Sequence, residues 1–126
     1  MPCQSIEYPK LRDKRILIVD DEPVISVDYR FQLLAAGALP AAFLASNASA
    51  LAYLELHTVD AVIVDYRLRD GTSAPLMRCL LDRGIPFIVI TGWPEKFRFH
   101  ETASAIVLEK PTVPSDLCRA LSEAIH

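Results

Sequence analysis

Three short apolar runs in this chain each stop at charged residues, and this pattern limits the folds that the chain can adopt. The runs are Ile16–Val19, Ala61–Val64 and Ile106–Leu108. Each has the length of a buried strand, and in an open parallel sheet the carboxyl ends of the strands form the edge where ligands bind. The side chains that we expect to meet at this edge are Asp20, Asp21, Asp65 and Lys110. Three carboxylates beside one lysine require a cation, and an all-oxygen ligand set favours Mg²⁺.

Strand and helix signals alternate along the whole chain. Strands are expected near residues 15–19, 41–44, 60–64, 85–90 and 105–108, with helices between them. Parallel strands need crossover connections, and helices usually supply these connections. The alternation therefore predicts an α/β fold, a doubly wound five-stranded parallel sheet with helices on both faces.

Two helical segments carry more specific expectations. In the first helix, apolar residues recur with the spacing of a core-facing stripe, and this stripe consists of Val24, Val27, Phe31 and Leu34. The fourth helix region, residues 93–102, contains a proline and three aromatic residues. Because proline disrupts a helix interior, we expect this helix to be short or distorted.

Length, charge and composition exclude several classes of protein. At 126 residues the chain suits one domain, and we expect a loosely held tail over 1–14 and a domain over 15–126. A formal net charge of −3 without a Lys/Arg cluster argues against nucleic acid as a partner. The N-terminus lacks a secretory signal, and the uncharged span 31–54 is too rich in alanine and turn residues for a membrane helix, so we predict a cytoplasmic protein. The cysteines and histidines show no metal-binding spacing, and we assign them no role.

The expected edge of the sheet suits phosphoryl transfer. A carboxylate at a strand end can attack phosphorus and form an acyl phosphate, and Asp65 is the best candidate because it ends the most apolar strand. We expect Asp21 and Asp65 to bind Mg²⁺ directly and Asp20 to act through water. Lys110 can pair with Asp65 at rest and with a phosphate oxygen after transfer. The hydroxyl of Thr91 can donate a hydrogen bond to the same phosphoryl group.

Four segments match one known family: RILIVDDEP at 15–23, DAVIVDYRL at 60–68, VITG at 89–92 and LEKP at 108–111. With them the chain, from about residue 14 to 125, resembles a response-regulator receiver domain of two-component signalling. The resemblance implies a flavodoxin-like fold with strand order 2-1-3-4-5. It also implies that Asp65 is the phosphoacceptor, Asp20 and Asp21 the acidic metal pair, Thr91 the switch hydroxyl and Lys110 the phosphate-sensing lysine.

The resemblance implies partners as well. In receivers the phosphoryl donor is a phosphohistidine on a sensor histidine kinase or a phosphotransferase protein. The receiver uses bound Mg²⁺ to catalyse only its own phosphorylation and dephosphorylation, so we expect a signalling domain and not an enzyme of metabolism. Residues 70–93 resemble small stand-alone receivers, often found in alphaproteobacteria, with a reduced fourth helix. We therefore expect a single-domain receiver, a monomer or weak dimer, that acts through a downstream regulator or drains phosphate as a sink.

The chain departs from the receiver pattern at Val107, where the switch aromatic normally lies. Arg67, two residues after the phosphoacceptor, is expected to offer its backbone carbonyl to the metal. Two other functions stay open. One is an unphosphorylated scaffold-type pseudo-receiver, which Val107 favours. The other is a haloacid-dehalogenase-like phosphatase, although such enzymes carry a D-x-D motif on the first strand where this chain has adjacent Asp20 and Asp21.

Overall fold

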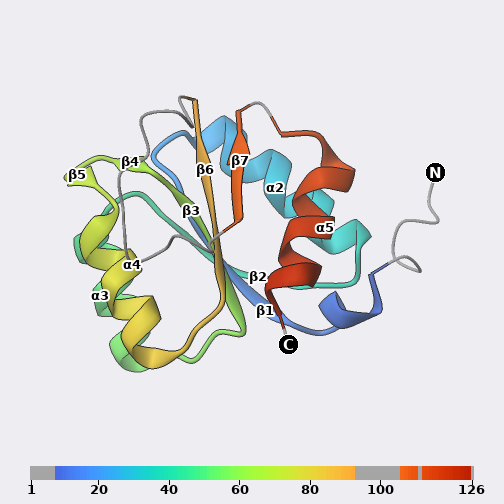
Figure 1. The fold of residues 1–126 in the computed structure, drawn as a ribbon, viewed down its shortest axis with the longest axis horizontal. Coiled ribbons are helices and arrows are strands. Elements are labelled where there is room, and N and C mark those ends of the chain that lie inside the picture. Colours follow the sequence, from blue (N-terminus) through green and yellow to red (C-terminus); the bar gives the residue numbers. More distant parts are fainter. Residues whose placement is uncertain (1–7, 93–105, 111, 126) are drawn as a thin grey trace.

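The centre of the molecule is a parallel sheet of five strands in the order β2-β1-β3-β6-β7 (Figure 1). The computed structural model describes residues 8–92, 106–110 and 112–125. The sheet strands are β1 (Arg15–Val19), β2 (Leu39–Leu44), β3 (Ala61–Asp65), β6 (Phe87–Thr91) and β7 (Ile106–Glu109). A separate antiparallel hairpin is formed by β4 (Arg67–Leu68) and β5 (Gly71–Thr72). Since β6 and β7 are thus the fourth and fifth strands of the sheet, the predicted order 2-1-3-4-5 is confirmed.

Helices cover both faces of this sheet, as the alternating pattern predicted. α2 (Pro23–Ala35) and α5 (Pro114–Ala124) lie on one face, and α3 (Asn47–Leu56) and α4 (Ala74–Arg83) lie on the other (Figure 1). On β1, Ile16 and Ile18 belong to the core with α2 and α5. Leu17 and Val19 belong to the core with α3 and α4. Every residue of β3 and β6 is buried, because both sides of these strands are covered.

The first helix of the domain turns a different face to the core from the one that the sequence predicted. Val24, Val27, Phe31 and Leu34, expected to face inward, are 83%, 47%, 68% and 49% exposed, and we call these four residues the α2 stripe. The buried residues of α2 are instead Ser26, Tyr29, Gln32 and Leu33. Both sets recur with a helical period, so the period alone does not choose between them. Packing against the sheet selects the face with Tyr29 and Leu33, because both side chains join the core between α2, α5 and the sheet.

Residues 8–14 pack against the domain and are not the loosely held segment that the sequence suggested. They include a 3-10 helix, η1 (Pro9–Leu11). Tyr8 and Leu11 join the core formed with α2 and α5, and the Tyr8 hydroxyl donates to the carbonyl oxygen of Ser115 at 3.3 Å. The mixed charge of the segment concealed these two apolar anchors. The division of the chain into a tail over 1–14 and a domain over 15–126 stays a prediction, since residues 1–7 lie outside the described residues.

The fourth helix region, residues 93–102, lies outside the described residues, and so its predicted distortion stays a prediction. The helices within the described ranges can be compared with the requirements of a membrane span. None of them is both long enough and apolar enough to cross a bilayer.

Leu11→Ala tests whether residues 8–14 belong to the folded core. Leu11 is 0% exposed, so truncation leaves a cavity and should lower the free energy of unfolding by about 2–4 kcal/mol. Urea unfolding followed by circular dichroism measures this loss. Leu56→Ala is the control: Leu56 is 82% exposed, and the expected change is less than about 0.5 kcal/mol. Equally small changes in the two variants would contradict the packing of this segment.

Candidate functional site

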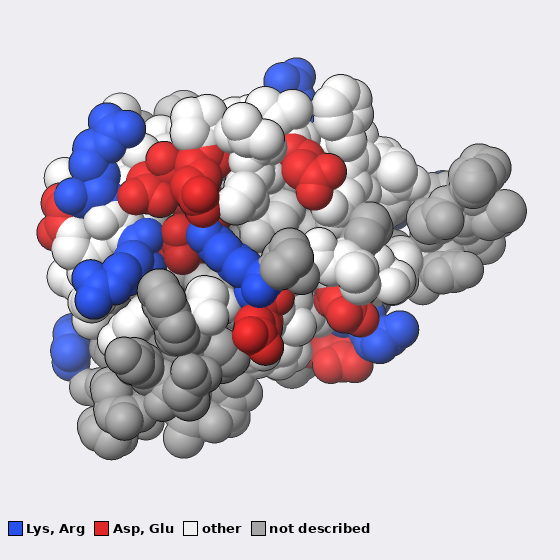
Figure 2. Space-filling model, turned by 90° about the horizontal axis from the view of Figure 1, so that it is seen from above, with Lys and Arg blue, Asp and Glu red and all other residues white. Residues whose placement is uncertain are grey.

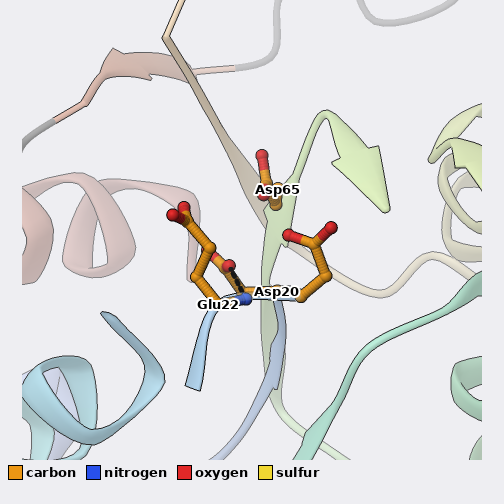
Figure 3. A group of neighbouring side chains, drawn as sticks. Asp20, Glu22 and Asp65 are labelled. Atoms are coloured by element: carbon orange, nitrogen blue, oxygen red, sulfur yellow. Dashed lines mark hydrogen bonds between the residues drawn. The ribbon is translucent and has the colours of Figure 1, made fainter. Parts of the chain in front are cut away.

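Polar residues from four strands lie at one edge of the sheet. Asp20 follows β1, Asp65 ends β3, Thr91 ends β6 and Lys110 follows β7. The strands end at the same level because Val64 of β3 is in register with Val19 of β1 and with Val89 of β6. Figure 3 shows Asp20, Glu22 and Asp65 close together where β1 and β3 end.

The Lys110 ammonium group lies among three carboxylates. Its Nζ atom is 3.0 Å from Asp65 Oδ2, 3.0 Å from Glu22 Oε1 and 3.5 Å from Asp20 Oδ2. The Lys110 side chain is only 18% exposed, so water screens these ion pairs less than it would on an open surface. One lysine thus connects the ends of β1, β3 and β7.

The electrostatics of the site reflect burial and crowding of negative charge. Burial and, to a lesser extent, the charge of Asp20 raise the pKa of Asp65 to about 6, although the Lys110 hydrogen bond opposes both effects. The pKa of Asp20 is also raised, again mainly by burial. Burial alone would lower the pKa of Lys110, but its hydrogen bonds to Asp65 and Glu22 outweigh this effect and raise it. The single ammonium group therefore compensates only part of the buried negative charge.

The donor atoms fit a hard divalent cation. Asp20, Asp21, Glu22 and Asp65 each offer one carboxylate oxygen, and these oxygens lie within 4.8 Å of one another. Asp20 Oδ1 accepts a hydrogen bond from the Glu22 amide at 2.8 Å (Figure 3), whereas Asp20 Oδ2 is buried and accepts none. A buried oxygen without a hydrogen bond is unfavourable. Lys110 Nζ lies 3.5 Å from Asp20 Oδ2 but is shared with Asp65 and Glu22, so a second positive group near this oxygen would be favourable. Mg²⁺ with its bound waters is a group of this kind.

A cavity of about 570 Å³ opens beside this cluster. Its lining includes Asp21, Asp65, Arg67, Thr91 and Lys110, which is every predicted site residue except Asp20. Asp20 is 4% exposed and lies deeper. From above, Figure 2 shows Asp and Glu side chains gathered next to Lys and Arg side chains. The cavity has room for a phosphoryl group together with a hydrated ion.

Comparison with known proteins places this geometry in a family. No protein-family model and no curated protein sequence matches the chain. Among solved structures, SdrG from Sphingomonas melonis Fr1 is 33% identical, over 87% of this chain and 94% of that one, with a TM-score of 0.77. A CheY-like response regulator receiver domain protein from Methanospirillum hungatei JF-1 is 29% identical, over 88% and 92%, with a TM-score of 0.77. The PhyR response regulator REC domain of Erythrobacter litoralis is 25% identical, over 91% and 92%, with a TM-score of 0.78.

The chain belongs to the response-regulator receiver domains. The predicted family and fold class are therefore confirmed, and a response-regulator role follows from them. Of the residues singled out from the sequence, the receiver domain brings Asp20, Asp65 and Lys110 within ion-pair distance, with Asp21 beside them. Arg67 contributes its backbone amide, which donates to Asp65 Oδ1 at 3.4 Å, while its side chain is exposed.

One member of the cluster was not identified from the sequence. Glu22 supplies a carboxylate to Lys110 and to the oxygen cluster. Its place directly after Asp20 and Asp21 was a signal, but an exposed residue before a helix is usually solvated. At the departure from the receiver pattern, Val107 lies half-buried in β7 and packs against the core on the α3 and α4 side.

The pH dependence of stability without metal tests the charge crowding at Asp65. The folded-state pKa of about 6 exceeds the ordinary 3.8, so the folded state binds this proton more tightly than the unfolded state does. This contribution to stability is complete below about pH 4 and is lost as the pH rises through about 6. We therefore expect Asp65→Asn to be more stable than the wild type by about 1–3 kcal/mol near pH 8, with the difference vanishing near pH 4.

Urea unfolding in the presence of a chelator measures this difference. The matched control is Asp82→Asn, the same chemical change at an exposed residue of α4. A stability difference for Asp65→Asn that does not change with pH would contradict the crowding of charge.

Proposed function

We propose that this receiver domain takes a phosphoryl group from a phosphohistidine onto Asp65 in two-component phosphorelay signalling. The observation that carries the proposal is the 3.0 Å contact between Lys110 Nζ and Asp65 Oδ2 within a cluster of carboxylates. In the transfer, an Asp65 oxygen bonds to phosphorus while the P–N bond to the imidazole breaks, and the imidazole leaves with its electron pair. Such a transfer depends mostly on positioning and charge neutralisation.

The proposed roles of the site residues follow from their positions. Asp21, Asp65 and the backbone carbonyl of Arg67 would hold Mg²⁺ directly, and Asp20 through water. When bound, the ion would supply positive charge next to the transferring phosphoryl oxygens. Lys110 exchanges its Asp65 partner for a phosphate oxygen. Thr91, which is 5% exposed at the cavity wall, donates its hydroxyl to the same group.

Incubation with acetyl phosphate and Mg²⁺ tests the chemistry without a kinase. Intact-protein mass spectrometry should show the addition of one phosphoryl group in the wild type and none in Asp65→Asn. The Lys110→Ala variant should react at least about tenfold more slowly, because a preorganised positive charge facing the phosphoryl group is lost. Glu55→Gln, a carboxylate change in α3 away from the cavity, should react like the wild type. An unmodified wild-type mass would favour the scaffold-type pseudo-receiver instead.

The phosphatase alternative is less well supported. A haloacid-dehalogenase-like enzyme would place its nucleophile and acid two residues apart on the first strand, whereas here Asp20 and Asp21 are adjacent. Asp20 is also held by an ion pair to Lys110 and a hydrogen bond from the Glu22 amide. Hydrolysis of a small phosphate ester with repeated turnover would revive this alternative.

For the phosphodonor, we propose docking on the α2 stripe by a helix of the kinase or phosphotransferase protein. The stripe is exposed and apolar, and its first residue, Val24, lies two residues after Glu22. A second cavity of about 200 Å³ joins it to the site, since Val27 and Phe43 line this cavity together with Asp20. A partner seated here would lie against the acidic edge of the sheet, where its phosphohistidine must approach. A helix with an apolar face is the chemistry that fits such a stripe.

Phe31→Ala tests this docking surface. Phe31 is 68% exposed, so folding should be little affected, while transfer from whichever kinase of the same organism reacts fastest with the wild type should slow about tenfold. Phosphorylation by acetyl phosphate, which needs no docking, should stay unchanged. Leu56→Ala, 82% exposed at the end of α3, is the control for loss of a surface apolar group. Equal transfer to the two variants would rule out the α2 stripe as the docking surface.

Several further features complete the proposed function. The receiver domain acts in the cytoplasm through a downstream regulator or as a phosphate sink. It works as a monomer or weak dimer and catalyses only its own phosphorylation and dephosphorylation. The conformational response differs from that of receivers with a switch aromatic, because Val107 has no aromatic ring that could rotate.

A further inference from the structure

A buried asparagine joins three elements beside the site. Asn47, the first residue of α3, is 6% exposed. Its side-chain Nδ2 donates to the Thr72 carbonyl at 2.8 Å and to Asp70 Oδ1 at 3.1 Å. Its Oδ1 accepts from the backbone amide of Leu76, in the first turn of α4, at 3.2 Å. One amide group thus ties the N-termini of α3 and α4 to the β4–β5 hairpin.

Asp70 fastens the same hairpin from its turn. Its carboxylate accepts hydrogen bonds from the backbone amides of Asn47, at 2.9 Å, and Ala48, at 3.1 Å. These amides are at the start of α3, where helix N–H groups lack partners within the helix and favour a negative charge. The bonds hold the pKa of Asp70 below its ordinary value, with the Asn47 amide contributing most. We call the two side chains and these contacts the Asn47–Asp70 clamp.

The clamped segment is the one that follows Asp65. Residues 67–72 form the hairpin, and Leu68 is anchored in the core on the α3 and α4 side. The amide of Arg69 donates to the carbonyl of Ala45 at 3.0 Å, which adds a backbone tie to the loop before α3. At the start of this segment the Arg67 amide donates to Asp65 Oδ1, and Arg67 lines the cavity. The position of the Arg67 main chain therefore depends on how the hairpin is held.

We propose that Asn47 and Asp70 are positioning residues, which hold the β4–β5 hairpin so that the Arg67 main chain meets Asp65 and the metal. The inference rests on the proposed Mg²⁺-dependent function and adds two residues to it that do not touch the site. Hydrogen bonds that served stability alone could join α3 and α4 anywhere along their length. The Asn47–Asp70 clamp instead joins them through the loop that carries a proposed metal ligand. Mutation of residues that orient metal ligands without binding the metal typically weakens metal affinity by about 10- to 100-fold.

The chain offers a matched control at the opposite ends of the same two helices. Arg83, the last residue of α4, donates to the Leu54 carbonyl at 3.0 Å and to Glu55 at 2.9 Å. Arg83→Gln therefore removes contacts between α3 and α4 far from the hairpin. This variant therefore shows how weaker contacts between α3 and α4 affect Mg²⁺ binding when the site itself is unchanged.

Calorimetric titration with Mg²⁺ compares the wild type with Asn47→Ala and Arg83→Gln. We expect Asn47→Ala to weaken Mg²⁺ binding at least about tenfold and Arg83→Gln to leave it within about twofold, although both lower the unfolding midpoint. Hydrogen exchange of the metal-free proteins gives a readout without Mg²⁺. Amides of residues 66–69 should exchange faster in Asn47→Ala than in Arg83→Gln. If Asn47→Ala does not fold, Asp70→Ala is the second variant, because Asp70 is exposed and its loss removes the hydrogen bonds to the start of α3. It should weaken Mg²⁺ binding and speed exchange of residues 66–69 as Asn47→Ala does.

The outcomes separate this inference from the function on which it rests. If the wild type binds Mg²⁺ and the clamp variants bind it equally well, the clamp is structural only and the inference is wrong. If the wild type does not bind Mg²⁺, the proposed function is wrong and the inference is lost with it. Weaker binding in the clamp variants and in Arg83→Gln alike would also overturn the inference, because general loosening of the helices would then explain the effect.

Discussion

The contacts of Lys110 with three carboxylates are the interaction on which the rest of the site depends. Asp20 and Asp65 are almost fully buried and would repel each other, and burial adds its own penalty for each charge. Only a positive group at the same place makes their approach tolerable. Lys110 comes from β7, at the edge of the sheet, and its reach across β6 to β3 and β1 requires the strand order that the structure has. Fold and electrostatics are therefore coupled in this receiver domain.

The meeting of Asp20, Asp65 and Lys110 could be predicted because it depends on the backbone alone. A strand that is buried on both sides reads as an uninterrupted apolar run, and its carboxyl end is visible as the first charged residue. Once the strands are parallel, those residues share an edge whatever the side chains between them do. Glu22 was missed for the opposite reason, since its contact with Lys110 depends on the direction of a side chain from a loop.

The features that the sequence did not reveal depend on tertiary contacts. In α2 the apolar period was read correctly, but the inward face is the one with Tyr29 and Leu33, because packing on the sheet and not hydrophobicity decides the rotation. Leu11 is buried by helices that are distant in the sequence. Asn47 and Asp70 are 23 residues apart, and no local pattern relates a helix-start amide to a hairpin turn. In each case the outcome depends on contacts between residues that are far apart in the sequence.

If the α2 stripe is the docking surface proposed above, a partner that covers it would also stabilise the folded receiver domain. A protein that binds only the folded form shifts the folding equilibrium in proportion to its own free concentration, so association would also protect the receiver from proteolysis. A receiver made in excess would instead present Val24 and Phe31 to other chains, and contiguous exposed apolar surface promotes self-association. The rotation of α2 about its axis thus leaves an apolar surface that a bound partner would remove from water.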